Sequence, residues 1–195
     1  MSTRSFVVLI VLLSAVLGVS VYAGFSLMQG RGGGSVQVGG PFSLTDQSGR
    51  RVTEKDFAGR LLLVNFGYTY CPDVCPTELA AMTAAIDQLG DAAKRVQPLF
   101  ITIDPTRDTV AQLALYHQNF HPSFAMLTGS EDEIARAARA YRVYYKKADS
   151  QSATEYLMDH SALVYLMGPD GRFLTHFTPQ TTPEQMAAEI LKQLG

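Results

Sequence analysis

The chain's two cysteines are the residues best suited to chemistry. Cys71 and Cys75 are the only cysteines among 195 residues, and three residues separate them. They follow the apolar run from Leu61 to Phe66, which predicts a buried strand, and they precede a helix expected to begin near Pro76. The positive end of a helix stabilises a thiolate and lowers the pKa of a thiol. Both cysteines can therefore be nucleophiles or metal ligands, and their spacing allows a disulfide or two sulfurs on one ion.

A metal ion would need a third ligand, and the four histidines are the candidates. His117 falls on the apolar stripe of its predicted helix, which favours a partly buried structural role. His121 follows at the end of that helix, where backbone carbonyls stabilise a cation. His176 alternates within a predicted hairpin strand and is expected to be exposed or paired. His160 differs, because it comes just before the predicted core strand 162–167, but spacing alone does not place that strand end beside the thiol pair.

The elements that must position these residues alternate between strand and helix patterns. Strands are expected at 42–44 with 52, 61–66, 96–103, 124–127, 162–167 and 173–177. Helices are expected after Cys75, Asp108, Ser130 and Thr182. Asp108 can cap its helix, while Ser130 with Glu133 and Thr182 with Gln185 match capping boxes. This order predicts an α/β domain with a mixed sheet covered by helices.

The amino-terminal segment has the composition of a membrane anchor. No charged residue occurs from Phe6 to Met28, which is longer than the roughly 20 apolar residues that a spanning helix needs, whereas a signal-peptide core needs about 7 to 15. Length favours a retained anchor, and a cleaved signal with Val21–Ala23 at the cleavage site is the alternative. Arg4 favours a cytoplasmic amino terminus, although Arg31 beyond the run weakens that argument. Too few residues precede the run for an Arg-rich transit peptide, so we expect the rest to face a bacterial periplasm.

Composition and glycine content complete the predicted organisation. Residues 1–28 are the expected anchor, 29–40 a glycine-rich tether, and 41–195 one domain of ordinary size. The chain is 47% hydrophobic, and 16 Lys and Arg nearly balance 18 Asp and Glu for a net charge of −2. These values exclude intrinsic disorder and argue against a nucleic-acid binder that relies on general basicity.

Three stretches of the chain resemble the signatures of the Sco/SenC family. They run from Gly67 to Pro76, from Asp104 to Thr109 and from Asp159 to Ala162. The resemblance covers essentially the whole globular part, and it implies a thioredoxin-like fold in which the thiol loop and the loop before the fourth main strand meet at one site. The chain departs from the common family pattern at Tyr70, where many members have histidine.

The same resemblance implies metal ligation by Cys71, Cys75 and His160. Two thiolates and one imidazole suit Cu(I), which is soft and accepts three ligands. The same set with a water would also suit zinc, and the resemblance with an oxidising compartment favours a copper ion, as Cu(I) or Cu(II). Asp159 could orient His160 or be a weak extra ligand, and Met158 is either a soft donor or an ordinary packing residue.

The leading functional hypothesis is a membrane-tethered copper metallochaperone. It would deliver copper to the dinuclear centre of the copper-containing subunit of cytochrome c oxidase, with other periplasmic copper chaperones as further partners. The alternative is a thiol-disulfide reductase that keeps the oxidase cysteines reduced, with Cys71 and Cys75 as its redox-active pair; a copper or redox sensor ranks last. For Asp104 to Asp108, two interpretations stay open: capping with a local ion pair to Arg107, or a loop that shapes partner docking.

Overall fold

A computed structural model of the chain describes residues 17–20, 22, 37–148 and 156–195. The predicted anchor and tether lie largely outside these residues; within them, Leu17–Ser20 and Tyr22 are helical. Among the described residues, no helix has the length and apolar character needed to cross a membrane. Val38–Gly195 form one compact unit.

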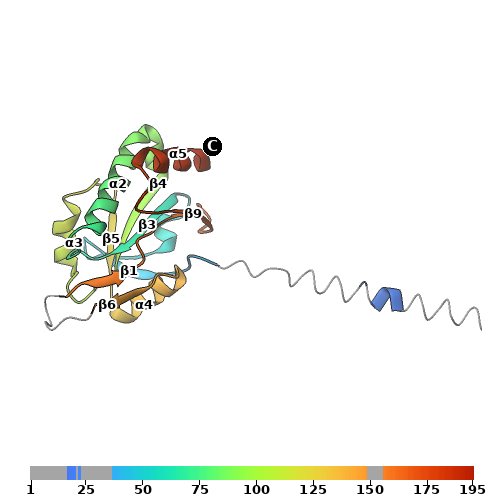
Figure 1. Ribbon diagram of the computed structural model, residues 1–195, viewed down its shortest axis with the longest axis horizontal. Helices are drawn as coiled ribbons and strands as arrows, with labels where there is room; N and C mark the ends of the chain where they lie inside the picture. The colour runs from blue at the N-terminus through green and yellow to red at the C-terminus, as the bar shows by residue number, and fades with distance from the viewer. Residues whose placement is uncertain (1–16, 21, 23–36, 149–155) are drawn as a thin grey trace, which may run out of the picture. The chain divides into compact units, whose positions relative to one another are not determined.

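A seven-stranded mixed sheet forms the centre of this unit, with the strand order β2-β1-β5-β4-β3-β8-β9 (Figure 1). Its strands are β1 Ser43–Asp46, β2 Arg51–Thr53, β3 Leu61–Gly67, β4 Val96–Thr102, β5 Ala125–Thr128, β8 Val164–Met167 and β9 Phe173–Phe177. β3 runs parallel to β4, and β4 runs parallel to β5. The remaining pairs are antiparallel, so the predicted mixed sheet and its strands are confirmed to within a few residues at each end.

The helices also begin close to where their capping signals predict. They are α2 Val74–Gln88, α3 Val110–His117, α4 Glu131–Ala140 and α5 Pro183–Leu194, with the short 3-10 helices η1 Glu54–Phe57 and η2 Gly90–Arg95. Both predicted capping boxes are present, at α4 and α5. The predicted Asp108 cap is wrong: the Thr109 side chain caps α3 by accepting from the Gln112 backbone N–H at 3.2 Å. The Asp108 carboxylate instead accepts hydrogen bonds from Thr69 and Thr102.

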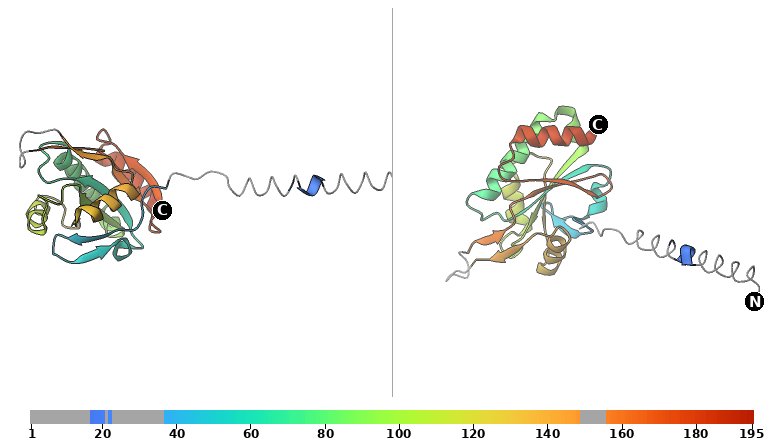
Figure 2. Two further views of the ribbon diagram at one scale, coloured as in Figure 1. Left: turned by 90° about the horizontal axis from the view of Figure 1, so that it is seen from below. Right: turned by 45° about the vertical axis from the view of Figure 1, so that its right-hand side comes forward.

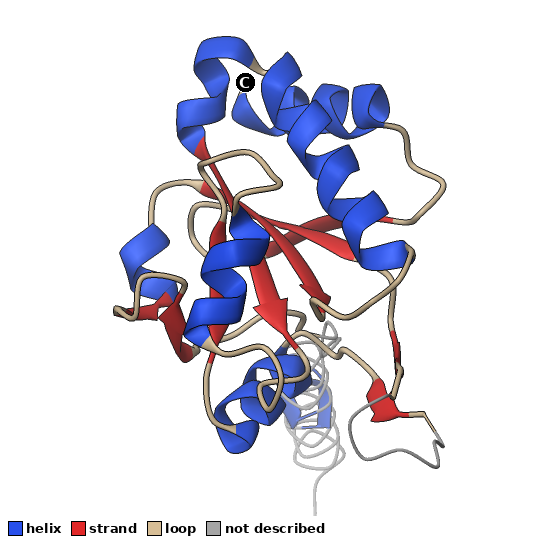
Figure 3. Ribbon diagram, turned by 90° about the vertical axis from the view of Figure 1, so that its left-hand side faces the viewer, coloured by secondary structure: helices blue, strands red, loops and turns tan. Residues whose placement is uncertain are grey.

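The sheet is covered by helices on both faces (Figure 3). This explains the apolar run of β3, which only Asn65 interrupts. Leu61 and Leu63 pack into the cluster built with α2, α3 and α5. Leu62, Val64 and Phe66 point to the opposite face, into the cluster built with α4. Successive side chains of a strand alternate between faces, so the two clusters hold β3 and the loop that follows it from both sides.

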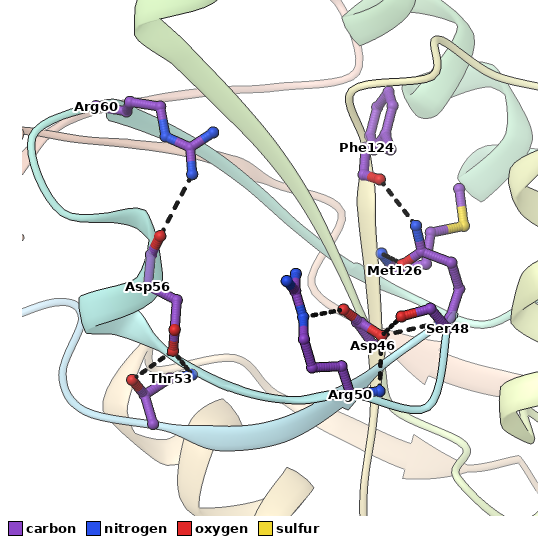
Figure 4. Close-up of polar contacts among 9 residues, drawn as sticks. Asp46, Ser48, Arg50, Thr53, Asp56, Arg60, Phe124 and Met126 are labelled. Carbon is purple, nitrogen blue, oxygen red and sulfur yellow. Dashed lines mark hydrogen bonds and ion pairs between the residues drawn. The ribbon is translucent and has the colours of Figure 1, made fainter.

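The β1–β2 hairpin is closed by the Asp46 side chain (Figure 4). Its Oδ1 accepts from the Ser48 backbone N–H, the Ser48 hydroxyl and the Arg50 backbone N–H, and Oδ2 accepts from the Arg50 Nε. Burial alone would raise the pKa of Asp46, but these hydrogen bonds with Ser48 and Arg50 bring it below its usual value. The turn uses Gly49 at φ 85°, a backbone conformation that favours glycine, so the predicted hairpin is confirmed with its turn chemistry.

A second, two-stranded sheet was not expected from the sequence. β6 Tyr145–Lys147 pairs with β7 Met158–His160 in antiparallel register, with Tyr145 opposite His160. Figure 2 shows this hairpin at the edge of the unit, and it forms a sheet separate from the main one. Each strand has three residues of mixed polarity, too short for an alternating pattern to stand out. His160 therefore ends a strand of its own instead of simply preceding β8.

Candidate metal centre

Three side chains that are far apart in the sequence converge at one point of the structure. One ligand atom each from Cys71, Cys75 and His160 lies within 4.8 Å of the other two. The Cys75 Sγ is 3.5 Å from the His160 Nε2, although 85 positions separate the two residues. Cys75 is buried, while Cys71 and His160 are partly exposed, so the group opens to the surface on the side of the latter two.

The thiol loop is fixed between β3 and α2. The carbonyl of Gly67, the last residue of β3, accepts from the Ile103 backbone N–H at 2.8 Å. Cys71 follows in a turn closed by its N–H to the Tyr68 carbonyl at 3.2 Å. Its sulfur accepts from the Cys75 backbone N–H at 3.4 Å, which is one of the free donors of the first turn of α2. The sequence prediction of a strand–loop–helix junction at the thiols is therefore confirmed.

The two thiols occupy different environments. Cys75 lies within the first turn of α2 and is fully buried, and burial raises the pKa of its thiol. The expected lowering of both thiol pKa values is therefore wrong for Cys75, since the loss of solvation outweighs the helix end. Without a metal, Cys75 is a neutral thiol that can donate to the imidazole nitrogen facing it.

His160 presents one nitrogen to the thiols because its other nitrogen has a partner. Its Nδ1 lies 3.1 Å from the Ser161 carbonyl oxygen, which can only accept, so Nδ1 carries the proton and the Nε2 lone pair faces Cys75. Burial lowers the pKa of His160, which keeps the ring neutral and able to bind a metal. The Tyr68 ring meets this imidazole edge to face, with centroids 6.0 Å apart.

The two residues before His160, Met158 and Asp159, do not share its role in the structure. Asp159 is exposed, and burial alternates along β7, so its carboxylate lies on the opposite face of the strand from the imidazole. The Ser161 carbonyl, not Asp159, supplies the orienting hydrogen bond. Met158 packs against the hydrophobic cluster that contains Phe66, as the packing interpretation predicts, and its role as a soft donor stays a prediction.

The other histidines are engaged elsewhere. His121 Nε2 lies 3.7 Å from Asp87 Oδ1, and its Nδ1 is 2.7 Å from the Ser123 hydroxyl. His176 is exposed, and its ring stacks on Phe173 at 6.3 Å between centroids. His117 is partly buried on α3, as its position on the apolar stripe predicts. Within the described part of the chain, His160 is the histidine grouped with the cysteines.

The donor set fits a soft metal ion. Two sulfurs and one imidazole nitrogen converge without a carboxylate among them, which is the preference of Cu(I), and three donors satisfy its coordination. Cys75 is buried from solvent, and the hydrogen bond from His160 Nδ1 to the Ser161 carbonyl fixes the orientation of the ring, as is typical of metal-binding histidines. Cys71, Cys75 and His160 thus form a candidate copper site.

Gly67 is required where β3 passes beneath the thiols. A Cβ at this position would lie 2.8 Å from the Cys75 Sγ and 2.9 Å from the Phe100 ring. We expect Gly67→Ala to displace Cys75, to lower the free energy of unfolding by about 1–3 kcal/mol and to weaken Cu(I) binding. Urea unfolding and competition with a Cu(I) chelator measure the two effects.

The matched control for that change is Gly171→Ala. Gly171 has φ 78° but open space around its Cβ position, so alanine there strains the backbone without touching the thiols. It should cost about 1 kcal/mol of stability and leave Cu(I) affinity unchanged. Wild-type Cu(I) affinity in Gly67→Ala would contradict this account of the site.

The loop after β4 carries a buried ion pair. Arg107 Nε pairs with Asp104 Oδ2, which confirms the local ion pair expected from the sequence. The same guanidinium lies over the rings of Tyr70 and Tyr156, at 4.8 and 3.6 Å from their centres. Tyr156 was missed by sequence reasoning, because residues 156–160 show no alternation of polarity from which to expect a strand.

Comparison with known proteins gives consistent matches. The sequence model described as SCO1/SenC matches residues 31–195. The human protein "Protein SCO1 homolog, mitochondrial" is 44% identical over 159 residues, which cover 80% of this chain and 53% of that protein. The Arabidopsis thaliana protein "Protein SCO1 homolog 1, mitochondrial" is 41% identical over 170 residues, 87% of this chain and 51% of the relative. The chain spans about half the length of these curated relatives.

Solved structures match with similar strength. The structure of Bradyrhizobium japonicum ScoI with copper bound has a TM-score of 0.75 and 45% identity, and covers 80% of this chain and 99% of that one. Yeast Sco1 with copper bound has a TM-score of 0.75 and 38% identity, over 81% of this chain and 88% of its own. The fold is therefore shared, over 80–81% of this chain, with proteins whose structures have copper bound.

Proposed function

Because the chain belongs to the SCO1/SenC family and has its thioredoxin-like α/β fold, we propose that it is a copper metallochaperone of cytochrome c oxidase assembly. The observation that carries the proposal is the convergence of Cys71, Cys75 and His160 within 4.8 Å. Relatives at 38–45% identity have structures with copper bound. Copper is the cargo of the protein in this proposal, held by the two sulfurs and the imidazole Nε2.

The unequal burial of the three ligands supports stepwise transfer of the ion. Cys71 and His160 are partly exposed and Cys75 is buried, so thiolates of an acceptor reach the ion from the side of the first two. Each acceptor sulfur replaces one ligand, and the three-coordinate preference of Cu(I) permits this exchange. Cys75 is released last and regains a proton, because its buried thiol is favoured over the thiolate once the metal has left.

The proposed partner and location extend this function to the whole chain. We assign residues 1–28 as a membrane anchor, 29–40 as a tether and 41–195 as the copper-binding domain on the periplasmic face of a bacterial plasma membrane. The uncharged run from Phe6 to Met28 supports the anchor, and the similarity to a Bradyrhizobium japonicum protein supports the bacterial setting. The acceptor is the copper-containing oxidase subunit, and other periplasmic copper chaperones are candidate donors. A net charge of −2 argues against nucleic acid as a partner.

A thiol-disulfide reductase is the second candidate function, and the proximity of the two sulfurs favours it. In that reaction the Cys71 thiolate attacks a disulfide of the partner, and Cys75 then resolves the mixed disulfide. The partner gains two electrons and two protons as its cysteines are reduced, and this chain is left with a Cys71–Cys75 disulfide. His160 takes no part in that electron balance.

His160→Ala separates the two functions. Removing the imidazole leaves two sulfurs for copper, and we expect Cu(II) affinity to fall by about a hundredfold or more and copper transfer to an apo oxidase domain to stop. Reduction of a model disulfide should still go to completion, because no electron passes through the imidazole. The exposed His176 provides the control variant, His176→Ala, which should behave as the wild type in both assays. Full oxidase assembly in cells carrying His160→Ala would favour the reductase.

A further inference from the structure

The ligands of the candidate site are held by two separate parts of the fold. Cys71 and Cys75 are fixed by β3 of the main sheet and by α2. His160 lies on β7, which pairs only with β6 in the two-stranded sheet and has no ladder to the main sheet among the described residues. The distance between His160 and the sulfurs therefore depends on the contacts that hold this hairpin against the body of the domain.

Arg107 makes several of these contacts. Its Nη1 donates to the Tyr156 carbonyl at 3.0 Å, and its guanidinium carbon lies 3.6 Å from the centre of the Tyr156 ring. The Tyr156 hydroxyl donates to Asp104 Oδ1 at 2.7 Å, while Asp104 Oδ2 pairs with Arg107 Nε. Tyr156 is thus held at its backbone, its ring face and its hydroxyl by two residues of the loop after β4.

Tyr156 is connected directly to the candidate ligand. Exposure alternates from residue 156 to residue 160, so Tyr156, Met158 and His160 face the same side of one extended segment. The segment is held extended by its pairing with β6 and by the Ala148 N–H, which donates to the Leu157 carbonyl at 2.9 Å. Fixing Tyr156 against Arg107 therefore directs the His160 imidazole toward the sulfurs.

The same guanidinium also contacts the thiol loop. It lies 4.8 Å from the ring centre of Tyr70, which precedes Cys71, and 5.7 Å from that of Tyr68, whose ring packs on His160. The Arg107 side chain is only 13% exposed, so most of its surface is used inside the domain and little is available to a partner. A planar guanidinium can stack on rings while it donates in its plane, which the ammonium of lysine cannot do.

We propose that Arg107 is a positioning residue that joins the thiol loop to the His160 strand and sets the geometry of the copper site. The inference rests on the proposed copper function, since it concerns the same three ligands. Arg107 acts through Tyr156 and Tyr70 and does not itself bind the metal. The sequence left open whether the 104–108 loop forms a local ion pair through Arg107 or shapes the docking of a partner. This inference gives Arg107 a role inside the protein.

The test uses Arg107→Gln and Arg107→Lys in the protein with all three ligands intact. Without the guanidinium stacked on Tyr156, the His160 imidazole is less well placed. We therefore expect about tenfold weaker Cu(II) binding, which is the lower end of the range for residues that orient metal ligands. The thiolate-to-copper charge-transfer band and the copper electron paramagnetic resonance spectrum should shift. Arg51→Gln is the matched control. It removes another arginine ion pair, from Arg51 on β2 to Glu133 on α4 at 2.7 Å, and neither residue belongs to the thiol loop or to the β6–β7 hairpin.

A double-mutant cycle with His160→Ala shows whether Arg107 acts through the imidazole. If it does, Arg107→Gln lowers copper affinity less in the His160→Ala background than in the wild type. An equal loss in both backgrounds, or an unchanged affinity and spectrum in the single variant, would overturn the inference. Arg107→Lys keeps the charge beside Asp104 and carries the same test if the glutamine variant does not fold. Failure of the wild type to bind or transfer copper would instead count against the proposed function.

Discussion

Replacing both Cys71 and Cys75 by serine is expected to lower Cu(I) affinity by about a thousandfold or more. Thiolates are the ligands that Cu(I) selects, while a serine hydroxyl stays protonated near neutral pH and is a hard donor. Only His160 of the convergent group would then remain, and one imidazole does not hold Cu(I) against a competing chelator. Competition with a chromogenic Cu(I) chelator, at equal protein concentrations, measures the loss.

The fold should survive this double change, which makes the copper result interpretable. Cys75 is buried, so Cys75→Ser places a hydroxyl in apolar surroundings at a cost of about 1–2 kcal/mol, and the more exposed Cys71 adds less. A Cys71→Ala/Cys75→Ala variant is the control, because alanine removes the same ligands without burying a hydroxyl. Both variants should unfold cooperatively in urea and both should lose copper. Undiminished copper binding by the serine variant would overturn the proposed function.

The main sheet could be predicted because its strands carry strong local signals. β3 and β4 are buried on both faces and are mostly apolar, and β8 and β9 flank a Pro-Asp-Gly turn. The β6–β7 sheet could not be predicted, since its pairing depends on tertiary contacts such as those of Tyr156 with Arg107. Short strands of mixed polarity have no periodicity from which to recognise them.

The candidate site was predictable in part, and the limits have physical causes. The closeness of Cys71 and Cys75 follows from local spacing, but the approach of His160 depends on the long-range packing of the hairpin and was available only through the family resemblance. The raised pKa of Cys75 could not be read from the sequence, because the helix end and burial act in opposite directions and the structure decides which is larger. The Asp108 prediction failed for a related reason: a neighbouring residue with the same capping ability, Thr109, left its carboxylate free for other partners.

Those partners make Asp108 the polar residue whose loss we expect to be most destabilising. Its side chain is fully buried, with Oδ2 accepting from the Thr69 backbone N–H at 3.0 Å and the Thr102 hydroxyl at 2.6 Å. Oδ1 accepts from the Thr69 hydroxyl at 2.6 Å. Burial raises the pKa of Asp108 above its usual value although these hydrogen bonds act to lower it. Thr69 is two residues before Cys71, so this carboxylate also holds the entry to the thiol loop.

Asp108→Ala should therefore lower the free energy of unfolding by about 3 kcal/mol, since it leaves three donors without their acceptor in the interior. Asp108→Asn is the matched variant: its oxygen can accept from the Thr69 N–H while its amide donates to the Thr69 hydroxyl, so the expected loss is about 1 kcal/mol. Urea unfolding of the two variants measures the difference. Cu(I) affinity should follow the same order, because only the alanine frees Thr69 and the loop that carries Cys71. Equal stability and equal copper affinity of the two variants would show that Asp108 does not hold this loop.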